Sequence, residues 1–231
     1  MSPPALVAEG LVRRFPLPDG SGVHTVLDGA SLNLAPGEAV AIVGPSGSGK
    51  TTLLNLLSGL ERPDAGTVQV AGHALESLSE DARADLRNRH VGLVLQQDQL
   101  LPQCTALENV LLPTLARAAA RDAGVRERAL SLLEAVGLAA FSSHRPSQLS
   151  AGQRQRVAVA RALIQQPGVL LADEPTGALD RETSSELLAL LLQVRAERDT
   201  ALLVVTHDDT IVAGMDRTLV LADGRLGPVT S

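Results

Sequence analysis

The chain has 231 residues, 45% of them apolar and 20% charged, which suits one globular domain with a full hydrophobic core. Lys and Arg number 20 and Asp and Glu 26, so the formal net charge is −6, and aromatic residues make up only 1%. Binding to nucleic acid normally requires basic surfaces and stacking aromatic rings, so we expect no nucleic-acid partner. The single cysteine excludes an internal disulfide, and no apolar stretch approaches the ~20 residues that span a bilayer. We expect a cytoplasmic protein.

Alternating and continuous apolar runs predict the secondary structure in chain order. Strands are expected at 5–15, 23–27, 39–43, 67–70, 91–95, 169–172, 201–205 and 218–221, helices at 50–58, 105–119, 125–136, 152–164 and 184–197, and a surface loop at 16–22. Strands and helices alternate at both ends of the chain and helices fill the middle, which predicts a parallel α/β core with a helical lobe. We expect a single domain over residues 1–231, with a helical subdomain at approximately 97–165.

Local signals mark the ends of the middle helices. Thr105 and Glu108 have the spacing of a capping box, in which two side chains satisfy free N–H groups at a helix start. Gly137 stands where the next helix is expected to stop. The apolar side chains on one face of that helix are Val125, Ala129, Leu132, Leu133 and Val136. We expect this face to be buried.

A glycine-rich segment lies between the apolar run 39–43 and a predicted helix. Its sequence at 44–51, Gly-Pro-Ser-Gly-Ser-Gly-Lys-Thr, matches the phosphate-binding pattern G-x-x-x-x-G-K-[ST]. Glycines let backbone N–H groups close around phosphates, and the helix start adds partial positive charge. We expect Lys50 to reach the β- and γ-phosphates and the Thr51 hydroxyl to help hold Mg²⁺. The nucleotide-binding residues predicted here are Gly44, Pro45, Ser46, Gly47, Ser48, Gly49, Lys50, Thr51 and Thr52.

Two carboxylates follow the apolar run 169–172. Asp173 stands where a P-loop site needs a second acidic partner for Mg²⁺. Glu174 would point the other way along an extended chain, so it is the candidate general base for an attacking water. The simpler alternative for both is a solvated acidic strand end. The phosphate-binding segment upstream favours the catalytic interpretation.

The order of the motifs resembles that of the ATP-binding cassette family. Leu-Ser-Ala-Gly-Gln at 149–153 is similar to the family's L-S-G-G-Q signature, Gly-Ala-Leu-Asp at 177–180 is similar to its D-loop, and His207 stands where its switch histidine follows a strand. The resemblance covers nearly the whole chain. It implies a P-loop NTPase core with a parallel sheet, an antiparallel β-subdomain near the N-terminus and an inserted helical subdomain. It also implies ATP and Mg²⁺ as cofactors and ATP hydrolysis as the reaction.

The signature segment has a local and a functional interpretation. Ser150 and Gln153 match a capping box, which would simply start a helix. The resemblance implies in addition that Ser150, Gly152 and Gln153 contact ATP held by a second copy of the chain, so that two ATP molecules are sandwiched in a head-to-tail homodimer. Ala151 stands where the family more often has glycine. If this residue needed a positive φ, alanine would be strained by roughly 1 kcal/mol.

Three further residues take their expected roles from the resemblance. It implies that His207 hydrogen-bonds the γ-phosphate and holds Glu174 and water in line. Gln96, after the run 91–95, would contact Mg²⁺ and water and report to the membrane partner, with the adjacent Gln97 as the alternative. Phe15 stands where the family stacks an aromatic ring on adenine, and an ordinary core phenylalanine is the alternative.

Within the family, the chain most resembles the compact bacterial branch of lipoprotein-release and macrolide-efflux ATPases, which work with separate membrane permeases. The likeness lies in segments 106–110, 144–146 and 172–177, whereas Leu93 and Asp98 stand where this branch often has Phe. We therefore expect an ATPase subunit, peripheral on the cytoplasmic face of the inner membrane, that drives a permease as its dimer closes and opens. One alternative is an ATP-switched regulatory cassette that controls cell-envelope machinery without cargo. Another, a cassette acting on DNA or ribosomes, is disfavoured by the negative charge.

Overall fold

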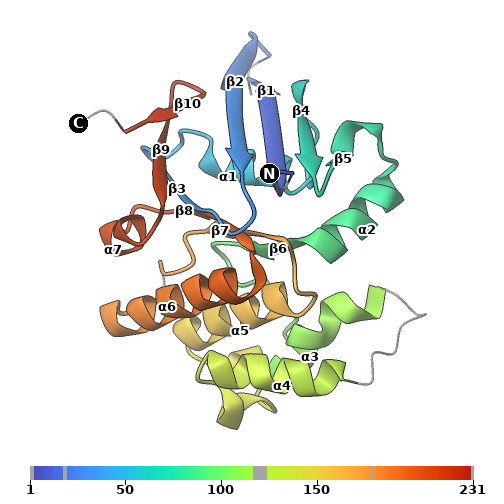
Figure 1. The fold of residues 1–231 in the computed structure, drawn as a ribbon, viewed down its shortest axis with the longest axis vertical. Coiled ribbons are helices and arrows are strands. Elements are labelled where there is room, and N and C mark those ends of the chain that lie inside the picture. Colours follow the sequence, from blue (N-terminus) through green and yellow to red (C-terminus); the bar gives the residue numbers. More distant parts are fainter. Residues whose placement is uncertain (1–2, 18–19, 117–123, 178, 230–231) are drawn as a thin grey trace.

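The computed structural model describes residues 3–17, 20–116, 124–177 and 179–229. These residues form layers: an antiparallel sheet, a helix beneath it, a second and mostly parallel sheet, and helices on the far side (Figure 1). The layers follow from the sequence pattern, because strands with continuous apolar sequences need cover on both faces. The fold class predicted from the sequence is confirmed.

The antiparallel sheet has the strand order β2-β1-β4-β5. Its strands are β1 (Leu6–Pro16), β2 (Val23–Leu34), β4 (Ala65–Val70) and β5 (His73–Ala74). The expectation that the second strand ends at residue 27 is wrong. Gly29 has a φ of 85° and lies at a bulge in the pairing with β1. The bulge shifts the apolar alternation by one residue, which hides the second half of the strand from a strict period of two.

The second sheet has the order β10-β9-β3-β8-β7-β6. Neighbouring strands are parallel except at one edge, where β10 (Arg225–Pro228) pairs antiparallel with β9. The parallel strands are β3 (Ala39–Val43), β6 (Val91–Val94), β7 (Val169–Asp173), β8 (Ala201–Val205) and β9 (Arg217–Ala222). All residues of β7 and β8 are buried, as continuous apolar runs predict.

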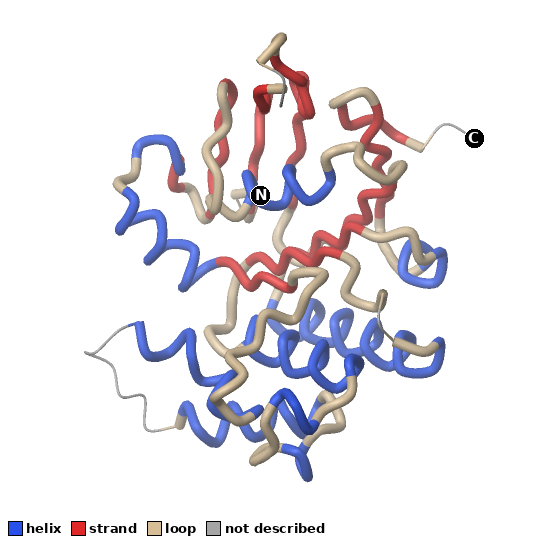
Figure 2. The backbone as a smooth tube through the Cα atoms, turned by 180° about the vertical axis from the view of Figure 1, so that it is seen from behind, coloured by secondary structure: helices blue, strands red, loops and turns tan. Residues whose placement is uncertain are grey.

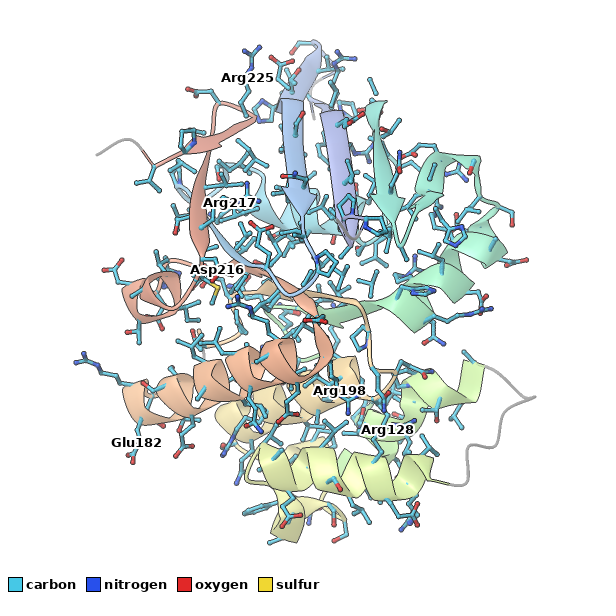
Figure 3. The ribbon with its side chains drawn as sticks, viewed as in Figure 1. Arg128, Glu182, Arg198, Asp216, Arg217 and Arg225 are labelled. Atoms are coloured by element: carbon cyan, nitrogen blue, oxygen red, sulfur yellow. The ribbon has the colours of Figure 1, made fainter. Side chains whose placement is uncertain are left out.

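Charged side chains fix the start of β9 against the start of β3 (Figure 3). Arg217 Nε lies 3.0 Å from Glu38 Oε1. The carboxylate of Asp216 accepts the Ala39 N–H at 2.9 Å and lies 2.6 Å from a guanidinium nitrogen of Arg195. These contacts set the register of the strand from which the phosphate-binding segment emerges.

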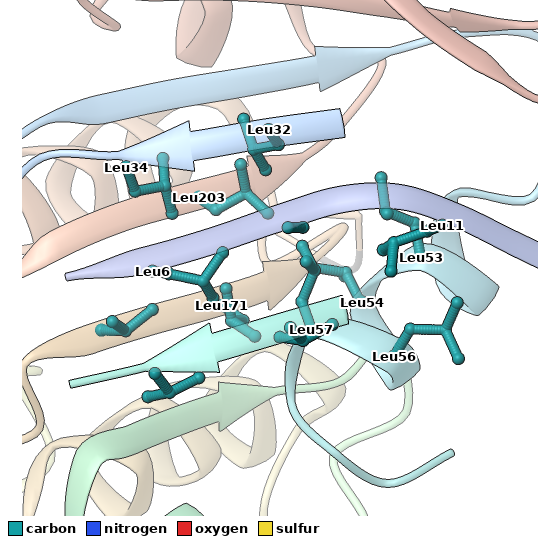
Figure 4. Packing of buried hydrophobic residues seen from close by; sticks show 14 of the residues in the cluster. Leu6, Leu11, Leu32, Leu34, Leu53, Leu54, Leu56, Leu57, Leu171 and Leu203 are labelled. Atoms are coloured by element: carbon teal, nitrogen blue, oxygen red, sulfur yellow. The ribbon is translucent and has the colours of Figure 1, made fainter. Parts of the chain in front are cut away.

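Helix α1 (Lys50–Leu57) lies between the two sheets (Figures 1 and 4). Four of its leucines are fully buried in a cluster that draws on both sheets. Members of this cluster are Leu53, Leu54, Leu56 and Leu57 of α1, Leu6 and Leu11 of β1, Leu171 of β7 and Leu203 of β8. Each fully buried leucine contributes ~1.5–3 kcal/mol. The cluster therefore holds the start of α1 firmly at the edge of the second sheet.

Helices α5 (Ala151–Leu163) and α6 (Arg181–Arg198) cover the opposite face of the second sheet, and α3 (Ala106–Leu111) and α4 (Val125–Ala135) pack beyond them (Figure 2). One apolar cluster joins α5 and α6 to the sheet, and another joins α3, α4 and α5. On the predicted face of α4, Ala129 and Leu133 are buried, as is Val136 directly after the helix. We propose the cluster of α3, α4 and α5 as the core of the helical subdomain expected at 97–165.

The predicted helix ends near residues 105 and 137 are confirmed. The Thr105 N–H donates to Glu108 Oε2 at 2.7 Å, and the Glu108 N–H donates to Thr105 Oγ1 at 3.2 Å, which completes the capping box. Gly137 has a φ of 70° just after α4. This left-handed conformation ends a helix and is easiest for glycine.

The single helix expected at 105–119 is wrong. Helix α3 ends at Leu111, and the chain continues as the 3₁₀ helix η2 (Leu112–Ala116). Residues 117–119 lie outside the described part of the chain. Pro113 explains the change, because proline has no N–H to donate to the carbonyl four residues earlier.

Several short or polar helices and strands were not predicted from the pattern of apolar residues. They are α2 (Glu80–His90), α7 (Asp209–Ala213), β5, β10 and the 3₁₀ helices η1 (Leu75–Ser77), η3 (Ala139–Phe141) and η4 (Pro146–Gln148). In α2, only Arg83 and Leu86 are buried, so the helix has no apolar face for periodicity to detect. Its start is marked instead by Ser79, whose side chain accepts the Ala82 N–H.

Candidate functional site

Three neighbouring parallel strands end at the same edge of the second sheet. Ile42 of β3 and Asp173 of β7 both pair with Val205 of β8. The segments that follow these strands therefore meet, as is typical of the carboxyl edge of an α/β sheet. They form a cleft of about 720 Å³, which is the size of a small-molecule site. The cleft is lined by His24, Val26, Gly44, Ser46, Gly47, Gly49, Lys50, Thr51, Thr52, Gln96, Asp173, Glu174 and His207.

The segment after β3 has the backbone of an anion cradle. Gly47 and Gly49 have φ values of 78° and 97°, a region that glycine enters most readily. A side chain at Gly49 would also lie 2.6 Å from Val26 Cγ1. Helix α1 begins at Lys50 without a side-chain cap. The N–H groups at its start therefore suit an anion such as a phosphate.

Polar side chains of the same segment also suit a phosphate. The Lys50 ammonium donates to the carbonyl oxygens of Gly44 and Pro45, both at 2.9 Å, which holds a positive charge beside the loop. Within the described residues, the buried hydroxyl of Ser48 has no hydrogen-bond partner. A buried polar group without a partner is costly. A triphosphate would supply acceptors for both side chains.

Thr51 and Asp173 form a direct pair across the cleft. The Thr51 hydroxyl donates to Asp173 Oδ2 at 2.7 Å. Burial raises the pKa of the Asp173 carboxyl, and the hydrogen bond from Thr51 opposes this shift. Hydroxyl and carboxylate oxygens are ligands that suit Mg²⁺. Within the described part of the chain, no group of three or more His, Cys, Asp or Glu side chains could hold a metal ion.

Glu174 reaches the cleft by a backbone conformation that the sequence does not predict. The expectation of an extended chain at this residue is wrong, because Glu174 has a φ of 47°. A left-handed conformation is strained for a residue other than glycine and occurs often at functional sites. The Glu174 N–H donates to the Val205 carbonyl at 2.9 Å, which holds the turn against β8. The side chains of Asp173 and Glu174 therefore separate through a turn and not through strand alternation.

The Glu174 carboxylate lies against the segment that follows β8. Its Oε1 is 2.8 Å from His207 Nδ1, and its Oε2 accepts a hydrogen bond from the Thr206 hydroxyl at 3.3 Å. The Glu174 side chain is 13% exposed, whereas that of His207 is 82% exposed. The hydrogen bond to Glu174 raises the pKa of His207, because the carboxylate favours the imidazolium form. The pair places a proton acceptor and an exposed imidazole on one wall of the cleft.

The structure separates the two glutamines that follow β6. Gln96 lines the cleft, and Gln97, its exposed neighbour, is absent from the described residues that line it. This placement favours Gln96 for the predicted contact with Mg²⁺ and water. The contact itself stays a prediction.

Phe15 lies beside the cleft and does not line it. It pairs across the antiparallel sheet with His24, which is a lining residue. The Arg13 guanidinium carbon lies 4.7 Å from the centre of the Phe15 ring, a cation–π contact. Arg13 is held in turn by Glu61 and Asp64, at 3.1 and 3.4 Å. The Arg13 guanidinium therefore lies over the Phe15 ring, and stacking of this ring on adenine stays a prediction.

Sequence reasoning missed three residues of this site, namely His24, Val26 and Thr206. His24 and Val26 belong to β2, and only the pairing of β2 with β1 brings them over the phosphate-binding segment. Nothing in their local sequence signals this. Thr206 offered a usable signal, because it is a polar residue between a buried apolar strand and the predicted His207.

The signature residues lie apart from the cleft. Ser150, Gly152 and Gln153 stand at the start of α5, and none of them lines it. The Gln153 N–H donates to Ser150 Oγ at 3.2 Å and the Ser150 N–H donates to Gln153 Oε1 at 2.8 Å, so the predicted capping box is confirmed. Ala151 is the first residue of α5, so its right-handed backbone carries no left-handed strain. In the expected D-loop, Ala178 lies outside the described residues.

Comparison with known proteins identifies the family. Residues 27–177 match the model of the family described as ABC transporter, which is more than half of the chain. The chain belongs to the ABC transporter family. It is similar to the lipoprotein-releasing system ATP-binding protein LolD of Pseudomonas syringae pv. tomato, with 54% identity over 90% of this chain and 91% of the relative. The LolD of Bordetella pertussis is 49% identical over 97% of this chain and 96% of its own length.

A solved structure extends the comparison to the whole ABC fold. The dimeric ATP-binding cassette MJ0796, in a post-hydrolysis state bound to ADP and Pi, superposes with a TM-score of 0.90 and 37% identity over 98% of this chain and 99% of its own. The chain is an ATP-hydrolysing, nucleotide-binding subunit of a membrane ABC transporter, as its motifs predict. Within the described residues, no helix has the length and apolarity needed to cross a bilayer.

Proposed function

We propose that this ABC ATPase acts as a head-to-tail homodimer in which Ser150 of each copy completes the cleft of the other. The observation that carries the proposal is the separation of two anion-binding arrangements in one chain. The cleft contains the phosphate cradle, Thr51, Asp173 and Glu174, whereas the signature residues stand at the start of α5 outside it. The first turn of α5 has no acidic residue, so its N-terminus favours an anion. The similarity to a dimeric cassette supports the same assembly.

Each side chain in the cleft takes a role set by its contacts. The N–H groups at the start of α1 and the Lys50 ammonium bind the phosphates. Thr51, Asp173 and Gln96 would hold Mg²⁺, which supplies positive charge to the β- and γ-phosphates when bound. Glu174 accepts a proton from water as the water oxygen bonds to the γ-phosphorus and the bond to ADP breaks.

His207 and Thr206 position the base. Both hydrogen-bond the Glu174 carboxylate, one on each oxygen, and so fix the direction in which Glu174 can accept a proton. The exposed ring of His207 can also donate to the γ-phosphate. We propose that Phe15, beside His24, stacks on the adenine ring.

We propose that hydrolysis drives a separate membrane permease of the lipoprotein-release kind from the cytoplasmic face of the inner membrane. The relatives at 48–54% identity are named as ATP-binding proteins of the lipoprotein-releasing system, which favours this role over a regulatory cassette without cargo. ATP closes the dimer and hydrolysis opens it, so the presence of the γ-phosphate shifts the equilibrium between the open and the closed dimer. The permease responds to that movement.

The substitution Glu174→Gln tests the proposed site and assembly together. The amide keeps the size of the side chain but accepts no proton, so turnover should fall by about 10²–10⁴-fold. Because ATP binding is retained, the variant should form a stable dimer with MgATP, measured by light scattering on a sizing column. A Glu174→Gln, Ser150→Arg double variant should bind ATP and stay monomeric. Near-parental turnover of Glu174→Gln would remove Glu174 from the role of base.

Controls separate these outcomes from general damage. Glu134→Gln alters an exposed carboxylate on α4 and should leave turnover and assembly at parental values. For the membrane role, the chain should co-purify with its permease from detergent extract, and a lipoprotein substrate should stimulate the ATPase of that complex. Stimulation by a small solute instead of lipoprotein would contradict the lipoprotein-release assignment.

A further inference from the structure

The segment that follows β6 is fastened to α5 over residues 95–99. The Gln155 side chain donates to the Leu95 carbonyl at 3.3 Å. The Arg161 guanidinium donates to the carbonyls of Asp98 and Gln99 at 2.7 and 2.9 Å. These contacts use backbone acceptors, so most residue types at 95–99 would preserve them.

One further contact depends on a particular side chain. Arg154 Nε donates to Asp98 Oδ2 at 2.8 Å, and the two side chains are 33% and 24% exposed. Arg154 also donates to the Leu149 carbonyl at 3.0 Å, so its guanidinium is held from both sides. The Asp98 carboxylate accepts the Leu100 N–H at 3.3 Å through its other oxygen. A phenylalanine at position 98 could make neither of the two contacts of the Asp98 carboxylate.

The ion pair connects a segment of one proposed reaction centre to a segment of the other. Asp98 lies two residues after Gln96, which lines the cleft. Arg154 lies four residues after Ser150, one helical turn into α5. If Ser150 serves the cleft of the second copy, as proposed above, the ion pair between positions 98 and 154 lies between the residue that meets one nucleotide and the signature that meets the other.

We propose that Asp98 and Arg154 are positioning residues whose ion pair couples Gln96 in one cleft to Ser150 at the other. The inference rests on the proposed roles of Gln96 and Ser150. Removing one partner leaves a half-buried charge unpaired and frees the segment to move relative to α5. Asp98 also lies close to the partly buried Arg161 guanidinium, so its charge compensates two arginines of α5.

A double-mutant cycle on the full chain with MgATP tests the proposal. Asp98→Asn and Arg154→Gln should each lower kcat by about fivefold, and the double variant should be no worse than either, because both remove the same link. The KM for ATP should change less than about twofold, since the phosphate cradle is intact. Asp98→Glu, which keeps the charge, should retain most of the parental kcat. Hydrogen exchange should become faster at 95–99 and at 150–154 together in either single variant.

Multiplicative losses in the double variant, or parental kcat in Asp98→Asn, would overturn the coupling. Asp85→Asn is the matched control, because it alters an ion pair with Arg89 on the exposed side of α2, and it should keep parental kcat and KM. The exchange pattern also separates loss of the ion pair from loss of the fold, because global unfolding exposes all segments and not only these two. If Asp98→Asn unfolds, Arg154→Gln still tests the proposal by the same measurement. A Glu174→Gln dimer that forms normally while the cycle shows no coupling would refute this inference and leave the proposed function standing.

Discussion

The cleft and the start of α5 are both built to receive an anion, yet they are built differently. The cleft gathers residues that follow β3, β7 and β8, and its Asp173 is only 4% exposed. The start of α5 is a local structure, in which Ser150 and Gln153 cap their own helix and Ser150 stays exposed. The cleft therefore depends on the packing of the whole core, whereas the fold of the signature depends only on its own helix, and its proposed contact with ATP would require a second molecule. In the proposed dimer, one chain thus contains a nearly complete site and one part of a second site.

The largest expected effect is on the affinity of the cleft for ATP. Lys50→Ala should weaken ATP binding by about 10- to 100-fold, because charge-assisted hydrogen bonds contribute roughly 1.5–3 kcal/mol. Calorimetric titration measures this directly. Lys50 is the one lysine of the sequence, so a reagent for ε-amino groups reports on this position alone, and MgATP should protect it. Unchanged affinity in Lys50→Ala would contradict the cradle assignment.

The caps of α5 and α3 allow a matched test of whether the start of α5 has a role beyond helix capping. Ser150→Ala and Thr105→Ala each remove the cap of a capping box and should each cost about 1 kcal/mol, or ~2–4 °C in Tm for a chain of this size. Only Ser150→Ala should also lower kcat, by about tenfold, because only Ser150 is proposed to meet the γ-phosphate of the second copy. Equal kcat losses in both variants would reduce Ser150 to a structural cap.

The smallest expected effect concerns the protonation of His207, which lies on the wall of the cleft. NMR titration should place the pKa of His207 above its ordinary value of about 6.5, and Glu174→Gln should bring it down, because the hydrogen bond to the carboxylate causes the shift. A raised pKa in the folded state adds stability that is fully present below the unfolded pKa and is lost as pH rises through the folded pKa. His207→Gln should therefore lower Tm slightly at pH 6 and not at pH 9, with a small difference because the ring is 82% exposed. An equal change at both pH values would exclude this pair as the cause.

The candidate site was largely predictable where its chemistry is carried by neighbours in sequence. Lys50 and Thr51 follow a buried strand and open a helix, and Asp173 ends another buried strand. The carboxyl ends of parallel strands meet at one edge, so the sequence alone places these residues together. Phe15 was predicted from its motif position, and its place beside His24 depends on strand pairing and not on local sequence.

The sequence determined the parallel strands of the second sheet, the caps at Ser150 and Thr105 and the chemistry of the phosphate cradle, because each is set by residues within a few positions of one another. Only the tertiary structure decided the left-handed turn at Glu174, which a hydrogen bond to Val205 of β8 holds. It also decided the ion pair between Asp98 and Arg154, whose partners are 56 residues apart. Such contacts depend on how helices and strands pack against one another, and a local sequence pattern does not predict that packing.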